Sequence, residues 1–134
     1  GAHVATMDVD IVHDRSPENV SRLMAFLQSI DAVQRGLDDR RMIPGETDFL
    51  GPGHCLLNTR LGPLDVLGVI EGGRGYGDLL DHAVDIQFRG HNMQVLELEM
   101  LVQLKRASKD PRDRRRLPIL EETLRQSALS KKDR

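Results

Sequence analysis

The sequence predicts an α/β (α+β) fold in which a mixed β-sheet carries helices packed mainly on one face. Segments with strand-like alternation and segments with helical spacing interleave along the chain, as expected for a sheet covered by helices. The chain has 134 residues, enough for one core of ordinary size, so we expect residues 1–134 to form a single domain. The net charge of -2 and the 3% aromatic content exclude a global attraction to nucleic acid and an aromatic surface for stacking bases.

The first two elements have the clearest patterns. Apolar residues at alternate positions from Met7 to Ile11 predict a strand. Ser16 suits an N-cap and Pro17 suits the first helical position, so a helix should begin there. Apolar residues then recur at helical spacing on one stripe: Val20, Leu23, Met24, Leu27 and Ile30.

The middle of the chain alternates between irregular and strand-like segments. Residues 32–53 are rich in glycine, proline and charge, which predicts a loop with one short turn of helix. Residues 54–62 and 63–70 read as two strands of a hairpin separated at Gly62-Pro63.

A glycine-rich loop and a second hairpin follow. The loop covers residues 71–78 and leads into a short helix near residues 76–83. Alternating apolar residues on both sides of residues 90–92 predict two strands that turn there.

The chain closes with two helices. They are expected near residues 97–108 and 111–129, the second bent or interrupted at Pro118, because proline lacks the N–H that a helix interior uses. We expect residues 130–134 to be a frayed tail.

The composition also indicates a compartment. Cys55 is the single cysteine, so no intramolecular disulfide can form. No apolar run is long enough to span a bilayer, and the first residues lack a basic segment followed by an apolar one. We therefore expect a cytoplasmic protein without a membrane partner.

Two carboxylates on the first strand are the strongest chemical signal. Asp8 and Asp10 are two positions apart, so their side chains share one side of the strand, with Cα atoms about 6–7 Å apart. Two such charges raise each other's pKa unless cations compensate. Either the strand is an edge whose polar side faces water, or the carboxylates hold a hard cation such as Mg²⁺.

A third acid occupies a similar position in the second strand region. Asp65 stands between Leu64 and Val66 in an otherwise apolar strand. Alone, it would be read as an edge or turn residue. Together with Asp8 and Asp10, it is predicted to complete a metal site built from three carboxylates.

These motifs carry a family resemblance that covers most of the chain. ATMDVDIV is followed by SPENV and an amphipathic helix, GPLDVLG follows NTRLG, and LELEMLVQLKRA precedes a charged segment with an acid at Asp113. The pattern resembles the polymerase-beta-like nucleotidyltransferase superfamily in its minimal bacterial form, and it is similar to AbiEii-type toxin nucleotidyltransferases. The family's Gly-Ser signature upstream of the paired acids is absent, since only seven residues precede Asp8. The resemblance therefore implies that the chain lacks the family's N-terminal strand-helix element.

The resemblance implies an activity and a set of partners. Asp8 and Asp10 would hold Mg²⁺ (or Mn²⁺) against a nucleoside triphosphate, and Asp65 would bind one metal ion and accept the proton of the attacking hydroxyl. A nucleoside monophosphate would pass to a hydroxyl acceptor, namely an RNA end, a protein or a small molecule. A toxin-like member would also have a cognate antitoxin as partner. The oligomeric state is left open.

Three further residues are candidates for binding the nucleotide, each with a plainer alternative. Lys105 lies on or beside the core-facing stripe of its helix. Either its amine simply extends from there to water, or it contacts the nucleotide phosphates, as the resemblance implies. Asp113 either complements a helix N-terminus or takes the place of an acid in related toxins. Arg74, in the glycine-rich loop, either belongs to a flexible connector or, like Tyr76, lines the acceptor pocket.

A basic cluster and two other functions remain as alternatives. Four arginines near residue 114 form either a solvated helix face or a phosphate footprint: Arg112, Arg114, Arg115 and Arg116. The chain could instead be a catalytically inactive nucleotidyltransferase fold that serves as a binding or regulatory module. A metal-dependent nuclease would use the same three acids.

Overall fold

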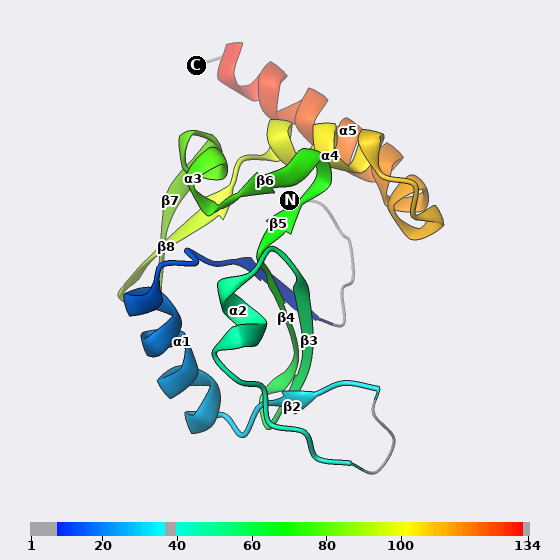
Figure 1. The fold of residues 1–134 in the computed structure, drawn as a ribbon. Coiled ribbons are helices and arrows are strands. Elements are labelled where there is room, and N and C mark those ends of the chain that lie inside the picture. Colours follow the sequence, from blue (N-terminus) through cyan, green and yellow to red (C-terminus); the bar gives the residue numbers. More distant parts are fainter. Residues whose placement is uncertain (1–7, 37–39, 133–134) are drawn as a thin grey trace. The chain divides into compact units, whose positions relative to one another are not determined.

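The computed structural model describes residues 8–36 and 40–132, which divide into two compact units (Figure 1). One unit lies within residues 6–78 and the other within residues 79–134. None of the helices in the described part of the chain combines the length and the apolar character that crossing a bilayer requires.

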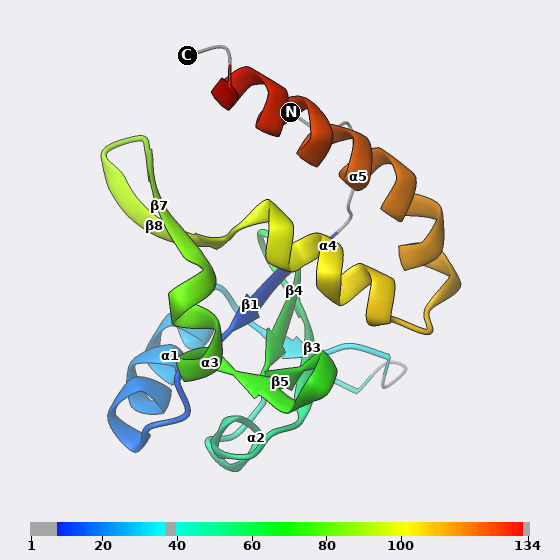
Figure 2. The same ribbon diagram turned by 90° about the horizontal axis from the view of Figure 1, so that it is seen from above.

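A mixed four-stranded sheet organises the first unit, as the sequence predicts. Its strand order is β1-β4-β3-β2, and the strands are β1 (Val9–Val12), β2 (Val33–Gln34), β3 (His54–Thr59) and β4 (Gly62–Leu67). β1 pairs with β4 in parallel, and the other two pairings are antiparallel. Figure 2 shows β1 beside β4. The parallel pairing requires a crossover connection between β1 and β4.

The crossover contains helix α1 (Pro17–Ser29), which begins where the sequence predicts. The hydroxyl of Ser16 accepts a hydrogen bond from the backbone N–H of Asn19 at 3.4 Å, and Pro17 occupies the first helical position. A single short helix, α2 (Thr47–Leu50), lies in the loop region where one helical turn was expected. The two-residue strand β2 in the same region was not expected.

The core of the first unit lies on one face of the sheet. Alternate residues of β3 and β4 pack there against α1 and α2, and the buried set is Val20, Leu27, Ile30, Ala32, Phe49, Cys55, Leu57, Leu64 and Val66. Burial raises the pKa of the Cys55 thiol to about 11, so this cysteine stays protonated and behaves as a small apolar residue. The residues between these positions, Leu56 and Asp65 among them, belong to the opposite face of the sheet.

The turn between β3 and β4 lies two residues earlier than expected. Thr59 pairs with Gly62, so the turn is formed by Arg60 and Leu61, and Gly62-Pro63 already belongs to β4. The Thr59 hydroxyl explains this position, because it accepts from the N–H of Leu61 at 3.1 Å and donates to the carbonyl of Gly62 at 2.7 Å. Side-chain bonds of this kind compete with glycine-proline signals in fixing a turn.

The glycine-rich segment forms compact structure. A two-stranded ribbon joins β5 (Val69–Ile70) to β6 (Arg74–Gly75), with helix α3 (Tyr76–Leu79) directly after it. Gly68, just before β5, admits no side chain, because a Cβ there would lie 2.6 Å from the carbonyl oxygen of Gly51. The absence of a side chain at this position lets the segment between α2 and β3 pack against the end of β4.

The second unit contains the predicted second hairpin and two helices. Its strands are β7 (Ala83–Phe88) and β8 (His91–Leu96), and its longer helices are α4 (Leu98–Ala107) and α5 (Pro111–Lys132). The expected interruption at Pro118 is wrong, because α5 continues through it. One lost hydrogen bond is tolerated here, since burial of Leu120 and packing of α5 on α4 hold the helix together. Residues 133 and 134 of the expected tail lie outside the described residues.

Candidate metal centre

The sheet brings together the three acids that the sequence singles out. Asp10 of β1 and Asp65 of β4 are direct partners in the parallel register, and Asp8 lies two positions before Asp10 on the same side of the chain. One potential ligand oxygen from each carboxylate lies within 4.8 Å of the other two. Asp10 is exposed, and Asp8 and Asp65 are partly buried. The carboxylates therefore converge on one small volume at the face of the sheet away from the core.

This donor set fits a hard divalent cation. Mg²⁺ and Mn²⁺ favour carboxylate oxygens, and Mg²⁺ is commonly held by one or two of them with water and substrate phosphates in the remaining positions. Around one Mg²⁺, two oxygens at about 2.1 Å from the ion stand about 3–4 Å apart. A spread of at most 4.8 Å thus needs only small side-chain rotations to reach that geometry.

One cation of the protein itself already faces this cluster. Nη2 of Arg35 lies 2.8 Å from Oδ1 of Asp65, and the Asp65 side chain is only 13% exposed. This contact is an ion pair whose geometry does not meet that of a hydrogen bond. Within the part of the chain that the structure describes, Oδ1 of Asp65 accepts no hydrogen bond. Nη2 instead donates to the carbonyl oxygen of Leu57 at 2.7 Å.

Asp65 holds its proton more tightly than an ordinary aspartate. Burial raises its pKa to about 6, and hydrogen bonding with Asp8 raises it as well, whereas the charge of Arg35 opposes both effects. A divalent ion bound to the cluster would remove most of this crowding, because it favours the ionised form of every ligand.

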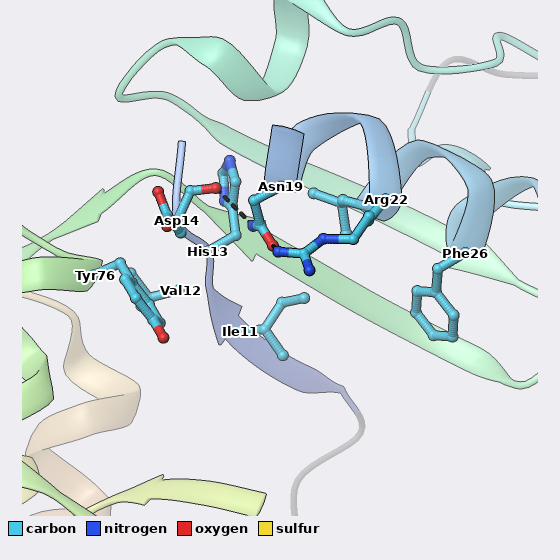
Figure 3. Close-up of a pocket in the computed structure, with 9 residues that line it drawn as sticks. Ile11, Val12, His13, Asp14, Asn19, Arg22, Phe26 and Tyr76 are labelled. Carbon is cyan, nitrogen blue, oxygen red and sulfur yellow. Dashed lines mark hydrogen bonds between the residues drawn. The ribbon is translucent and has the colours of Figure 1, made fainter. Parts of the chain in front are cut away.

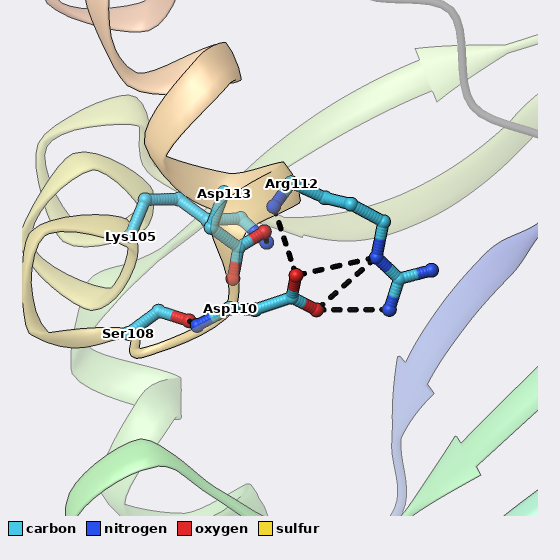
Figure 4. A network of polar contacts seen from close by, with 5 residues as sticks. All are labelled: Lys105, Ser108, Asp110, Arg112 and Asp113. Atoms are coloured by element: carbon cyan, nitrogen blue, oxygen red, sulfur yellow. Dashed lines mark hydrogen bonds and ion pairs between the residues drawn. The ribbon is translucent and has the colours of Figure 1, made fainter.

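Lys105 and Asp113, two of the predicted nucleotide-binding residues, contact each other in the second unit. Nζ of Lys105 donates to Oδ1 of Asp113 at 2.8 Å, which ties α4 to the first turn of α5 (Figure 4). Burial alone would raise the pKa of Asp113, but hydrogen bonds from Lys105 and Ser108 outweigh it and lower the pKa. Lys105 therefore does more than extend its amine to water, and Asp113 does more than complement the N-terminus of α5, because the two side chains bind each other.

The neighbouring basic cluster is partly neutralised within its own helix turn. The guanidinium of Arg112 lies against the carboxylate of Asp110, with Nη2 2.8 Å from Oδ2, and this contact lowers the pKa of Asp110 to about 2 (Figure 4). Arg114 and Arg115 are exposed. Because Arg112 is paired with Asp110, this helix offers less positive charge for binding phosphate than the four arginines in the sequence suggest.

Arg74 and Tyr76 follow the β4 strand within the first unit. Arg74 is partly buried in β6, opposite Ile70. Tyr76 lines a pocket of about 410 Å³, together with His13 and Asp14 after β1 and Asn19 and Arg22 on α1 (Figure 3). The volume is in the range of small-molecule sites. Ile11 and Val12 of β1, the strand that carries Asp10, also line the pocket.

Two residues of the first unit have roles that sequence reasoning missed. His13 is buried, with Nε2 2.6 Å from the carbonyl oxygen of Phe49 and Nδ1 3.2 Å from that of Leu67, so it joins the end of β1 to α2 and β4. Arg35 is the counter-ion of Asp65. In the sequence, Arg35 is a single arginine before Gly36, and no regular spacing relates it to an acidic residue. Its pairing with Asp65 could therefore not be predicted.

Comparisons with protein-family models, with curated proteins and with solved structures find no match for this chain. A function must therefore be argued from the geometry of the carboxylate cluster and its surroundings.

Proposed function

We propose that this protein is a metal-dependent nucleotidyltransferase that moves a nucleoside monophosphate from a nucleoside triphosphate to a hydroxyl acceptor. The observation that carries the proposal is the convergence of Asp8, Asp10 and Asp65 within 4.8 Å on one face of a mixed sheet. Mg²⁺ (or Mn²⁺) is the cofactor that this donor set suits. Its chemistry, when bound, would be to neutralise the triphosphate and orient the reacting oxygens.

The three carboxylates have different surroundings, which suits different roles. Asp10 is exposed, and together with Asp8 it offers carboxylate oxygens on one side of β1. Asp65 is more buried and has a pKa of about 6. We propose that Asp65 accepts the proton of the attacking hydroxyl, as the resemblance implies, because a bound metal ion would keep its carboxylate in the ionised form that can accept a proton.

The remaining contacts to substrates are assigned by the resemblance and by the pocket. Lys105, Asp113 and Arg74 are proposed to bind the nucleotide. Lys105 has three N–H donors, and its bond to Asp113 uses one of them. The pocket beside Tyr76 is proposed to admit the acceptor, because Ile11 and Val12 of the Asp10 strand line it.

An inactive binding or regulatory module is the second candidate, and the Arg35 contact favours it. An arginine that neutralises a metal ligand, as Arg35 does at Asp65, is what a degenerate site would retain. In that case the cluster would be a structural charge network without a bound ion.

The experiment offers each of the four α-labelled nucleoside triphosphates to the folded protein, with Mg²⁺ or Mn²⁺ and with RNA or protein acceptors. We expect metal-dependent transfer of label that Asp10→Asn abolishes. The matched control is Asp31→Asn, an exposed acid of the same unit whose φ of 55° asparagine also accepts.

Three outcomes separate the candidates. Transfer or metal-dependent binding of a triphosphate supports the proposal. A folded protein that binds no triphosphate with either metal ion supports the inactive module. Shortening of RNA in the absence of any triphosphate indicates a nuclease.

A further inference from the structure

Arg35 stands in a row of side chains that crosses the sheet to the carboxylate cluster. The backbone N–H of Arg35 donates to the carbonyl of Leu56 at 2.9 Å, Leu56 is the direct partner of Asp65, and Asp65 is the direct partner of Asp10. Side chains in such a row share one face of a sheet and lie within reach of one another. The row therefore places a long cation and two acids on the face opposite the core.

The guanidinium of Arg35 is held in place without help from Asp65. Nη2 donates to the carbonyl oxygen of Leu57 at 2.7 Å, and Nε donates to Oδ1 of Asn58 at 3.2 Å. Both partners belong to β3. An arginine fixed at two points of its planar fork loses little further entropy when it meets a carboxylate, and it cannot withdraw without breaking those bonds.

A metal ion in the cluster would have this fixed cation as a neighbour. Nη2 lies 2.8 Å from Oδ1 of Asp65. With a metal about 2.1 Å from whichever Asp65 oxygen binds it, the two positive charges would stand within about 7 Å of each other. In a partly buried site this repulsion is not fully screened, so it opposes metal binding by a factor of ten or more.

We propose that Arg35 is a built-in counter-ion that competes with the divalent metal for Asp65 and keeps metal affinity low until a negatively charged nucleotide enters. The inference rests on the proposed function, because it takes the metal site as given. Without metal, Arg35 offsets the repulsion among the three carboxylates. With a triphosphate present, the phosphate charges offset Arg35, so metal and nucleotide bind together rather than in sequence.

The test is a Mn²⁺ titration followed by the EPR signal of the free ion, without nucleotide. Arg35→Gln is expected to bind Mn²⁺ about tenfold more tightly than the wild type, equivalent to about 1.4 kcal/mol. Arg35→Lys keeps the charge but loses the two-point attachment to β3, so its affinity should rise about threefold. The matched control, Arg60→Gln, removes an arginine whose Nε lies 4.0 Å from Asp31 in the same unit, and should change nothing.

Unchanged or weaker Mn²⁺ binding by Arg35→Gln would overturn the inference, since a merely structural arginine would not restrain the metal. If that variant does not fold, unchanged binding by Arg35→Lys has the same meaning. Failure of the proposed function looks different: Asp65→Asn would then bind Mn²⁺ as the wild type does.

A double-mutant cycle of Arg35→Gln and Asp65→Asn tests the ion pair separately, by urea denaturation without metal. Additive shifts in the denaturation midpoint would also overturn the counter-ion role.

Discussion

Asp10 and Asp65 are direct partners across the parallel pairing of β1 with β4. The backbone ladder, and not a flexible loop, therefore sets the separation of these two carboxylates. Asp8 joins them from the same side of the chain, within 4.8 Å. An arrangement of like charges fixed by a sheet costs folding free energy in the absence of a cation, and this cost leads to several measurable consequences.

Removing one acid should stabilise the metal-free protein while it removes function. For Asp10→Asn we expect an increase in unfolding free energy of about 0.5–1 kcal/mol without metal, because a like-charge cross-strand pair is relieved. Nucleotidyl transfer should be lost. Urea denaturation with EDTA measures the first effect, and a clear loss of stability would instead identify Asp10 as a structural hydrogen-bond partner.

The raised pKa of Asp65 predicts a pH dependence with a definite sign. Between the unfolded value near 4 and the folded value of about 6, the folded state binds more protons, so stability falls as pH rises through this window. The contribution is on the order of 2 kcal/mol, allowing for solvent around the other carboxylates.

The comparison that isolates this effect is the difference between wild type and Asp65→Asn at pH 4 and pH 7, with and without Mg²⁺. Without metal, the wild type should lose stability relative to the variant as pH rises. Saturating Mg²⁺ should reverse the trend. Parallel pH profiles for the two proteins would show that Asp65 titrates normally.

The Lys105–Asp113 pair should stabilise the second unit at neutral pH. Lys105→Met leaves a largely buried carboxylate without its main donor, which should cost about 1–3 kcal/mol. Because the pKa of Asp113 is lowered, its contribution is present above the unfolded pKa near 4 and is lost as pH falls through the lower folded value. Thermal unfolding should therefore separate Lys105→Met from wild type at pH 7, and the difference should shrink as pH falls below about 4.

Gly68 should tolerate no side chain. In Gly68→Ala the new Cβ would meet the Gly51 carbonyl at 2.6 Å, and relieving this overlap should cost about 1–3 kcal/mol of stability. Gly77→Ala is the matched control, because nothing lies within 4 Å of its Cβ position and alanine favours the short helix α3. Equal melting temperatures for the two variants would contradict the close packing at Gly68.

The carboxylate cluster could be predicted from the sequence because its determinants are local. Alternation around Asp8 and Asp10 fixes which side of the strand they share, and Leu64 and Val66 do the same for Asp65. The structure adds the parallel pairing of β1 with β4, which the sequence pattern does not reveal. The start of helix α1 could be predicted in the same way, because Ser16 and Pro17 mark it within five residues of the strand that carries Asp10.

The sequence does not predict the contacts that Arg35 and His13 make around the carboxylate cluster and at the end of β1. Arg35 reaches Asp65 only because a strand of two residues pairs with β3, and two residues show no periodicity. His13 is buried by contacts to Phe49 and Leu67, which are 36 and 54 positions away. The helix through Pro118 similarly depends on packing that outweighs the local preference of proline.

The central claim is that Asp8, Asp10 and Asp65 bind a divalent ion. A crystal structure of the protein soaked in Mn²⁺, with anomalous scattering recorded, tests it most directly. We expect an anomalous peak about 2.2 Å from oxygens of all three carboxylates, with Asp65 turned toward the ion and away from Arg35. Well-ordered crystals in which Arg35 still faces Asp65 and no peak lies among the three acids would contradict the account.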